Sequence, residues 1–301
     1  MPKIATTTTT ILSCLPRPIF RIAIVSSSCA SRQAVRGFSL IEMAIAVFVM
    51  GLLLGALLVP LRAQVENRRL ADTWAILDQA RDTLLGYVAA RGHFPCPANA
   101  TDGGGSGNGQ EASGTNHTAG SISCPASVTG SGTSVYVGFF PAASLGFAPV
   151  DSNGFARDAW GTQQNRLRYA VARRTVNLVV EPLTRVDGMR TATMNAFITT
   201  NELIRICRTG TGVSSSDCAV ANDRLANNAM AVIWSLGQNA PTGGSAPHED
   251  KNFRANVLTN FTRVFVQAEV SGTGGSVFDD QLTWVSPAMV FNRMIAAGTL
   301  P

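Results

Sequence analysis

The chain has 301 residues, of which 46% are hydrophobic and 14% charged, a composition that excludes an intrinsically disordered protein. Its formal net charge of +5 comes from the five basic residues ahead of residue 38, where no acid occurs: Lys3, Arg17, Arg21, Arg32 and Arg36. From residue 38 onward bases and acids balance, so no basic patch is expected and nucleic acid is not an expected partner.

The first predicted element is an apolar segment over residues 38–61, in which Glu42 is the only charge. A helix needs roughly 20 residues to cross the hydrocarbon core of a bilayer, so this segment is long enough to span it. The bases before it place residues 1–37 in the cytoplasm and the C-terminal part outside, although Arg62, Arg68 and Arg69 follow on the far side. Four downstream cysteines also favour export to an oxidising compartment.

Two ordinary explanations of this segment leave Glu42 unexplained. A secretory signal has an apolar region of about 7 to 15 residues and a small-residue cleavage site, which LRAQVENRR does not supply. A plain anchor fits the length, but a carboxylate at the bilayer centre costs roughly 2.5 to 3.5 kcal/mol, and less near an interface. The glutamate is therefore predicted to have a function and a partner.

The segment GFSLIEM, residues 37–43, follows a basic leader and opens the apolar helix, and it resembles the N-terminal cleavage and methylation motif of type IV pilins and type II secretion pseudopilins. The resemblance implies that a prepilin peptidase cuts between Gly37 and Phe38 and methylates the new amino group of Phe38. It also implies that Glu42 pairs with this amine, either in a neighbouring subunit or in its own chain. Burying the two ions together offsets the cost of burying either, and it fixes the register of adjacent helices.

The same resemblance implies the partners and the location of the protein. The partners are prepilin peptidase, other pilin or pseudopilin subunits, an inner-membrane assembly platform and the lipid bilayer. The protein starts as a single-pass inner-membrane precursor and later enters a periplasmic or surface filament. Residues 1–37 form a leader that processing removes, and because this leader is long for the family, either it is unusual or the start codon is assigned too early.

The helix is predicted to continue over residues 62–92, because no proline occurs between Pro60 and Pro95. An apolar stripe recurs at three-, four- and seven-residue spacing and is interrupted by Arg81; its members are Leu70, Trp74, Leu77, Leu84 and Val88. Gly92 is the expected stop, and Pro60 is expected to kink or locally melt the helix.

Residues 93–134 form a predicted loop, rich in glycine and serine beyond residue 98. Asp102, Asn108 and Glu111 are weak candidate ligands for calcium, since their spacing does not match the usual calcium-loop pattern. No other metal site and no cofactor are expected.

The remainder, residues 135–301, is predicted to be a β-rich domain. Six segments are rich in β-branched and aromatic residues and bounded by turn residues, namely 135–140, 167–172, 177–180, 230–236, 263–270 and 281–286. A helix is expected over 195–207, and another from the cap Ser286 and Pro287 to Gly298. The fold class is α+β: a long N-terminal helix, membrane-spanning in its first half, packed on an antiparallel sheet as in pilins.

Four cysteines remain after processing, and they allow three pairings. The local pairs Cys96 with Cys124 and Cys207 with Cys218 are favoured, because each closes a short polar loop. Zinc is the rival interpretation, but C-x-x-C spacing is absent from the sequence.

No enzyme is expected. The sequence lacks the nucleophile elbow, the P-loop and the dinucleotide-binding glycine pattern. His93, His117 and His248 are expected at the surface in loops, and Asp279 and Asp280 are expected to be turn residues or to orient the preceding loop. The predicted function is a minor pilin or pseudopilin, with a non-assembling single-span envelope protein, binding or enzymatic, as the alternative.

Overall fold

A computed structural model describes most of the chain after the leader: residues 37, 39–98, 109–112, 124, 135–173, 175–176, 179–180, 183–198, 203–214, 216–241, 247–254, 263–270 and 278–300. Phe38, Asp102, Asn108 and His117 lie outside these residues. The chain divides into two units, Met1–Leu57 and Leu58–Pro301. Helix α1 (Leu40–Arg91) contributes to both.

The first unit contains the apolar part of α1. Every described side chain from Leu40 to Ala56 is exposed, and this stretch includes a window long and apolar enough to cross a membrane. A helix that is apolar on all sides must be covered by something other than water, and a bilayer meets that requirement. This observation supports membrane anchoring.

The helix is continuous through Pro60, so the local melting predicted there is not found. Proline removes one intrahelical hydrogen bond without ending the helix, because the turns on both sides keep theirs. The predicted stop is confirmed: α1 ends at Arg91, and Gly92 follows with a φ of +73° and donates its N–H to the carbonyl of Val88 at 2.8 Å.

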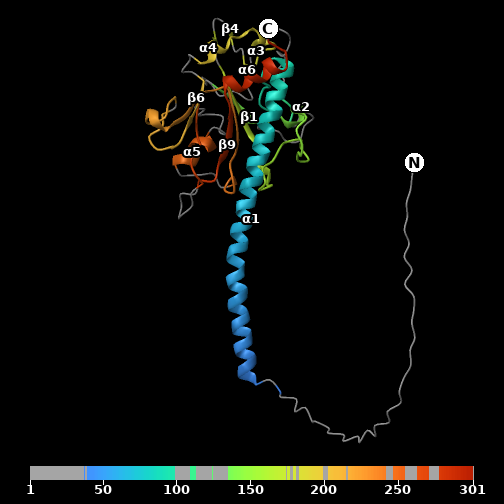
Figure 1. The fold of residues 1–301 in the computed structure, drawn as a ribbon, viewed down its shortest axis with the longest axis vertical. Helices are drawn as coiled ribbons and strands as arrows, with labels where there is room; N and C mark the ends of the chain where they lie inside the picture. The colour runs from blue at the N-terminus through green and yellow to red at the C-terminus, as the bar shows by residue number, and fades with distance from the viewer. Residues whose placement is uncertain are drawn as a thin grey trace, which may run out of the picture. The chain divides into compact units, whose positions relative to one another are not determined.

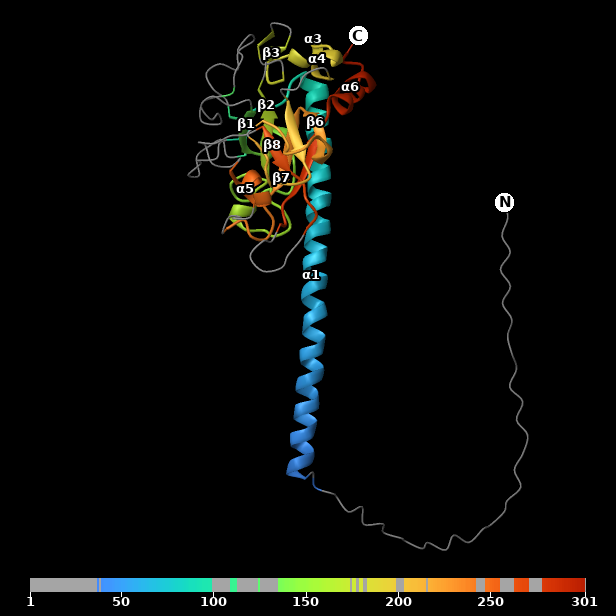
Figure 2. The same cartoon turned by 90° about the vertical axis from the view of Figure 1, so that its left-hand side faces the viewer.

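In the second unit, the later part of α1 lies along the main β-sheet (Figures 1 and 2). Its buried positions follow the three- and four-residue spacing of one helix face: Thr73, Leu77, Ala80, Leu84 and Val88. The predicted stripe is wrong for Trp74, which is 38% exposed because it lies one residue, about 100°, round from Thr73. Arg81 interrupts the stripe at its edge, where it donates to Thr283 Oγ1 at 3.1 Å.

The main sheet has four antiparallel strands in the order β1 (Val135–Phe139), β2 (Arg168–Ala172), β7 (Ala231–Ser235) and β9 (Gln281–Val285). Every residue of the first three strands is buried, so both faces of this sheet are covered. Because both faces are buried, these strands have mostly apolar sequences and do not alternate between apolar and polar residues. The predicted antiparallel sheet is confirmed here.

A second sheet was only partly predicted. Its order is β6 (Arg224–Ala229), β5 (Ile204–Cys207) and β8 (Val264–Val266), with β5 antiparallel to β6 but parallel to β8. The helix predicted over 195–207 is therefore wrong at its C-terminal end: α4 spans only Met194–Ile198. IRIC forms the central strand instead. Pairing on both sides outweighs any helical pattern at these β-branched residues.

Short elements complete the unit. β3 (Thr175–Val176) pairs with β4 (Val179–Val180), and the remaining helices are α2 (Ala142–Leu145), α3 (Gly188–Thr191), α5 (Pro247–Arg254) and α6 (Pro287–Ala296), with single 3-10 turns at Gln163–Asn165 and Ala221–Asp223. The boundaries predicted for α6 are confirmed. Ser286 accepts a hydrogen bond from the N–H of Met289, and Gly298 follows with a φ of +66°.

Candidate functional site

The N-terminal motif is an open segment followed by a capped helix. Gly37 is exposed, and among the described residues no atom beyond its two chain neighbours lies within 4 Å of where its Cβ would be. Ser39 caps α1: its Oγ accepts from the N–H of Ile41 at 3.3 Å, and its carbonyl accepts from the N–H of Met43 at 3.1 Å. The bond that a peptidase would cut thus adjoins an uncovered residue, directly before a rigid helix.

Glu42 lies in the first turn of α1 and is exposed. A carboxylate in the first turn interacts favourably with the positive end of the helix dipole. The helix therefore holds this charge in its first turn, four residues along the chain from Phe38, whose amino group cleavage after Gly37 would free. Sequence reasoning found Glu42 but missed the Ser39 cap, whose signal is a serine just before the apolar run.

The second unit contains both local disulfides that the sequence favoured. Cys96 and Cys124 are bonded with their Cα atoms 5.6 Å apart, and so are Cys207 and Cys218. Both geometries are ordinary for disulfides. Disulfides persist in oxidising compartments, so they fit an exported domain.

Glu111, one of the weak calcium candidates, supports the first disulfide. Its carboxylate accepts from the N–H of Cys96 at 3.2 Å and from the hydroxyl of Tyr87 on α1 at 3.3 Å. Burial raises the pKa of Tyr87 to about 12, and the negative charge of Glu111 adds to that shift. These bonds tie the cysteine segment to the end of α1.

The surface prediction is wrong for His93, which is buried beside this segment. Its ring nitrogen Nδ1 lies 3.1 Å from the carbonyl oxygen of Arg91, and its ring meets Tyr87 edge-on at 5.8 Å between centroids. The residue follows the helix stop directly, and the chain turns back there onto the core. No local pattern in the sequence signals that burial.

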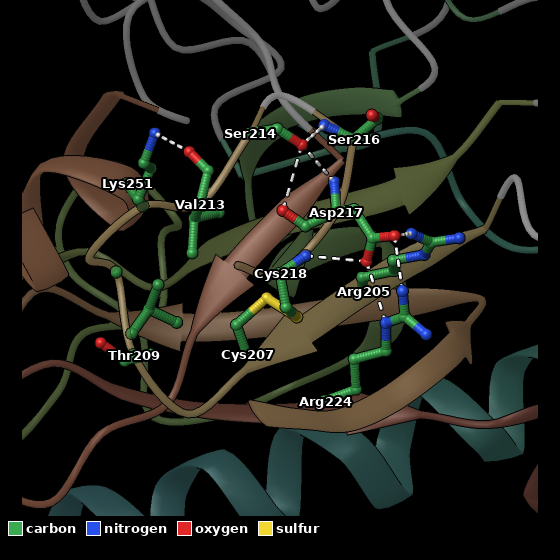
Figure 3. The surroundings of a disulfide bond; sticks show 12 residues. Arg205, Cys207, Thr209, Val213, Ser214, Ser216, Asp217, Cys218, Arg224 and Lys251 are labelled. Atoms are coloured by element: carbon green, nitrogen blue, oxygen red, sulfur yellow. Dashed lines mark hydrogen bonds and ion pairs between the residues drawn. A yellow bond between two sulfur atoms is a disulfide. The ribbon is translucent and has the colours of Figure 1, made fainter. Parts of the chain in front are cut away.

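The second disulfide is supported by a cluster of charges (Figure 3). Asp217, next to Cys218, accepts from Arg224 at 2.6 and 2.9 Å and pairs with the buried Arg205 of β5. The hydrogen bonds from Arg224 hold the pKa of Asp217 at about 2. The cysteine pair was predictable from its spacing, but this ion cluster was not, because Arg205 and Arg224 come from different strands.

The loop closed by this disulfide also contacts α5. The N–H of Gly210 donates to Nδ1 of His248 at 2.8 Å, and Lys251 Nζ donates to the carbonyl of Val213 at 3.2 Å. His248 therefore belongs to a helix, not to the predicted loop, and its Nδ1 acts as an acceptor. Its environment is that of a structural residue.

The comparisons with known proteins concern the N-terminus. Residues 32–58 match the family model described as the prokaryotic N-terminal methylation motif. Neither the comparison with curated proteins nor that with solved structures gave a significant match. The matched region includes Gly37, Phe38 and Glu42, so the chain carries a type IV pilin-like prepilin motif. This motif supports processing by prepilin peptidase, and the apolar helix that follows it supports membrane anchoring.

Proposed function

We propose that this protein is a minor pilin or pseudopilin, a structural subunit of a type IV pilus or of a type II secretion pseudopilus. The observation that carries the proposal is the methylation motif that leads into a capped helix with Glu42 in its first turn. The described side chains of this helix from Leu40 to Ala56 are all exposed, and the stretch is predominantly apolar. Assembly requires a helix that leaves the bilayer and packs among identical or related helices. An all-round apolar surface suits both environments.

The proposed maturation assigns a role to each part of the chain. Residues 1–37 are a cytoplasmic leader that is removed; residues 38–61 span the inner membrane, and residues 62–92 are the amphipathic half of the helix. Residues 93–134 form a loop, and residues 135–301 form the domain that faces the periplasm or the outside. The two disulfides support this orientation, because they require an oxidising compartment.

In the filament, Glu42 of one subunit pairs with the methylated amine of Phe38 in its neighbour. Each ion alone would be costly in an apolar bundle, and together they offset much of that cost. Because only one register brings the two groups together, the pair sets the axial offset between subunits. The protein then acts mechanically, its exposed domain contacting neighbouring subunits or cargo, and no enzymatic activity is assigned to it.

The test replaces Glu42 and follows processing and incorporation separately. Glu42→Val and Glu42→Gln are expected to insert into the membrane and to be cleaved, but to cross-link poorly into filaments. Glu66→Gln, the same change further along α1, is the matched control and should incorporate normally. Normal incorporation of both Glu42 variants would contradict the pairing, and an unassembled wild-type chain would favour a non-assembling envelope protein.

A further inference from the structure

Three arginines closely follow the apolar run, on the side away from the leader: Arg62, Arg68 and Arg69. Basic residues near a membrane span concentrate on its cytoplasmic side, so the proposed orientation does not account for a basic group on the opposite side. Glu66 is the only acid between residues 58 and 71. The turns of α1 just beyond the predicted span therefore carry a net positive charge that the assembly function does not explain.

Two of these arginines line a pocket within the second unit. The pocket has a volume of about 400 Å³; one wall is α1 from Leu61 to Arg69, and the other is formed by Trp160 and Gln238. Arg62 and Arg69 are seven residues apart, so they lie about two turns apart on nearly the same side of the helix. The guanidinium of Arg69 lies over the Trp160 ring, 5.1 Å from its centroid, a cation–π arrangement that orients it.

The two arginines of this pocket have no carboxylate partner among the described residues. Arg68, which does not line the pocket, pairs with Asp72 at 3.8 Å, but neither Arg62 nor Arg69 forms an ion pair in the part of the chain that is described. Glu66 also lines the pocket and is likewise unpaired there. Two positive charges and one negative charge therefore share the pocket, and one further negative charge would balance them.

The position of the pocket along α1 matches the headgroup layer of a bilayer. Arg62 and Arg69 lie roughly 1.5 and 12 Å beyond Leu61 along the helix axis, and the polar layer of one leaflet is about 5 to 8 Å thick. Side chains of a helix lean toward its N-terminus, which in α1 is the end with the apolar run, so the long side chain of Arg69 reaches back toward that layer. Leu61 and Val65, each 53% exposed, add apolar surface to the same pocket.

We propose that Arg62, Arg69 and Trp160 form a binding site for the phosphate of a phospholipid, and that this site favours an anionic headgroup. Guanidinium groups bind phosphate oxygens through paired, charge-assisted hydrogen bonds. The apolar surface of Leu61 and Val65 favours a lipid over free phosphate, because it can contact the glycerol and the upper acyl carbons. Tryptophan is also enriched where proteins meet the membrane interface.

Lipid binding here would fix the depth of α1 in the bilayer, since the phosphate meets both arginines at only one position along the helix. If the chain becomes a filament subunit, which rests on the proposed function, the lipid must dissociate when the helix leaves the membrane. The binding itself requires neither processing nor assembly. It can therefore be tested on the unprocessed chain, and its failure would be distinguishable from a failure to assemble.

The test uses the full chain purified in a nonionic detergent and titrated with phosphatidylglycerol or phosphatidylcholine, with the retained lipid counted by native mass spectrometry. The wild type should retain a single phosphatidylglycerol and bind it more tightly than phosphatidylcholine, because only phosphatidylglycerol brings a net negative charge. A large excess of inorganic phosphate should not displace the lipid. Complete displacement would overturn the lipid assignment and identify a site for a free anion.

Variants separate this pocket from a general attraction to negative lipids. Arg69→Gln should weaken phosphatidylglycerol binding by about tenfold, the loss expected for hydrogen bonds to a charged group. Arg68→Gln is the matched control: it makes the same change at the neighbouring residue, outside the pocket, and should keep the affinity within about twofold because Asp72 already pairs with Arg68. Both side chains are exposed, so neither change should disturb the fold. Equal losses in the two variants, or a wild type that retains no lipid, would overturn the proposal.

Discussion

The charged residues next to the Cys207–Cys218 disulfide are held together by one side chain, that of Asp217. It joins Arg205 and Arg224 beside Cys218, and its pKa is held at about 2 because the ionised form accepts their hydrogen bonds. The stabilisation is therefore complete above pH 4 or so, where the unfolded chain is also ionised. It is lost as the pH falls toward 2.

Asp217→Asn is expected to lower the free energy of unfolding by about 1 to 2 kcal/mol at neutral pH, since the carboxylate is partly exposed and solvent weakens the pairs. Denaturant unfolding of the wild type and the variant should converge as the pH approaches 2. Asp223→Asn, in the same hairpin, is the matched control and should change little. Equal stability of wild type and Asp217→Asn at pH 7 would contradict this account.

The pKa of Asp279 is shifted in the opposite direction, upward. Burial raises the pKa of Asp279 from 3.8 to about 7, and the negative charge of the nearby Glu249 adds to the shift. Because the folded state holds this proton more tightly than the unfolded state, stability falls as the pH rises from 4 to 7.

Wild-type unfolding midpoints are expected to decrease over that range, and Asp279→Asn should reduce the decrease. The measurement is the difference between the midpoints of wild type and variant at each pH. A difference that is constant from pH 4 to pH 7 would show that the Asp279 proton is not linked to folding.

Local chemistry was enough to predict several single residues. Cys96 and Cys207 have near partners in sequence, Gly92 is the left-handed stop of α1, and Ser286 caps α6. The proximity of Glu249 to Asp279 and Asp280 was not predictable, because Glu249 and Asp279 are 30 positions apart in the sequence and the fold alone brings them together. The turn role expected of Asp279 is replaced by a buried one that orients residues 238–239.

At the scale of elements, the later part of α1 supplies the central face of the core. Leu84 is fully buried between this helix and the main sheet. Its truncation leaves a cavity that a sheet covered on both faces cannot readily fill. The helix therefore depends on tertiary packing here more than on its own propensity.

Leu84→Ala is expected to cost about 2 to 5 kcal/mol of unfolding free energy, measured by denaturant unfolding in detergent. Val65→Ala removes an apolar side chain of the same helix that is exposed, and it should change stability by no more than about 0.5 kcal/mol. Similar losses for both variants would mean that α1 does not pack on the sheet as described.

Strands were predicted correctly where a segment is rich in β-forming residues and also pairs with neighbouring strands in the fold. The segments of β1, β2, β7 and β9 are rich in β-branched and aromatic residues, and all form strands of one sheet. β6, with the sequence RLANNA, has little β character and forms a strand only because β5 pairs with it. β5 itself was assigned to a helix, since a central strand is specified by its two neighbours more than by its own residues.

At the scale of the whole molecule, the N-terminal motif was the strongest signal in the sequence, and the family match at residues 32–58 confirms it. The motif is local: glycine, a large apolar residue and an acid at fixed spacing. Residues 135–301 carry no comparable signature, and the order of the described strands there follows from long-range packing. That is why the N-terminal motif could be predicted from the sequence, while the second sheet could not.

The central claim is that prepilin peptidase processes this chain between Gly37 and Phe38 for assembly. The direct measurement is mass spectrometry of the mature N-terminus from membranes of cells with and without the peptidase. We expect an N-methylated Phe38 only where the peptidase is present, and the intact leader where it is absent. An uncut chain, or one cut at another residue, in cells with active peptidase would contradict the claim.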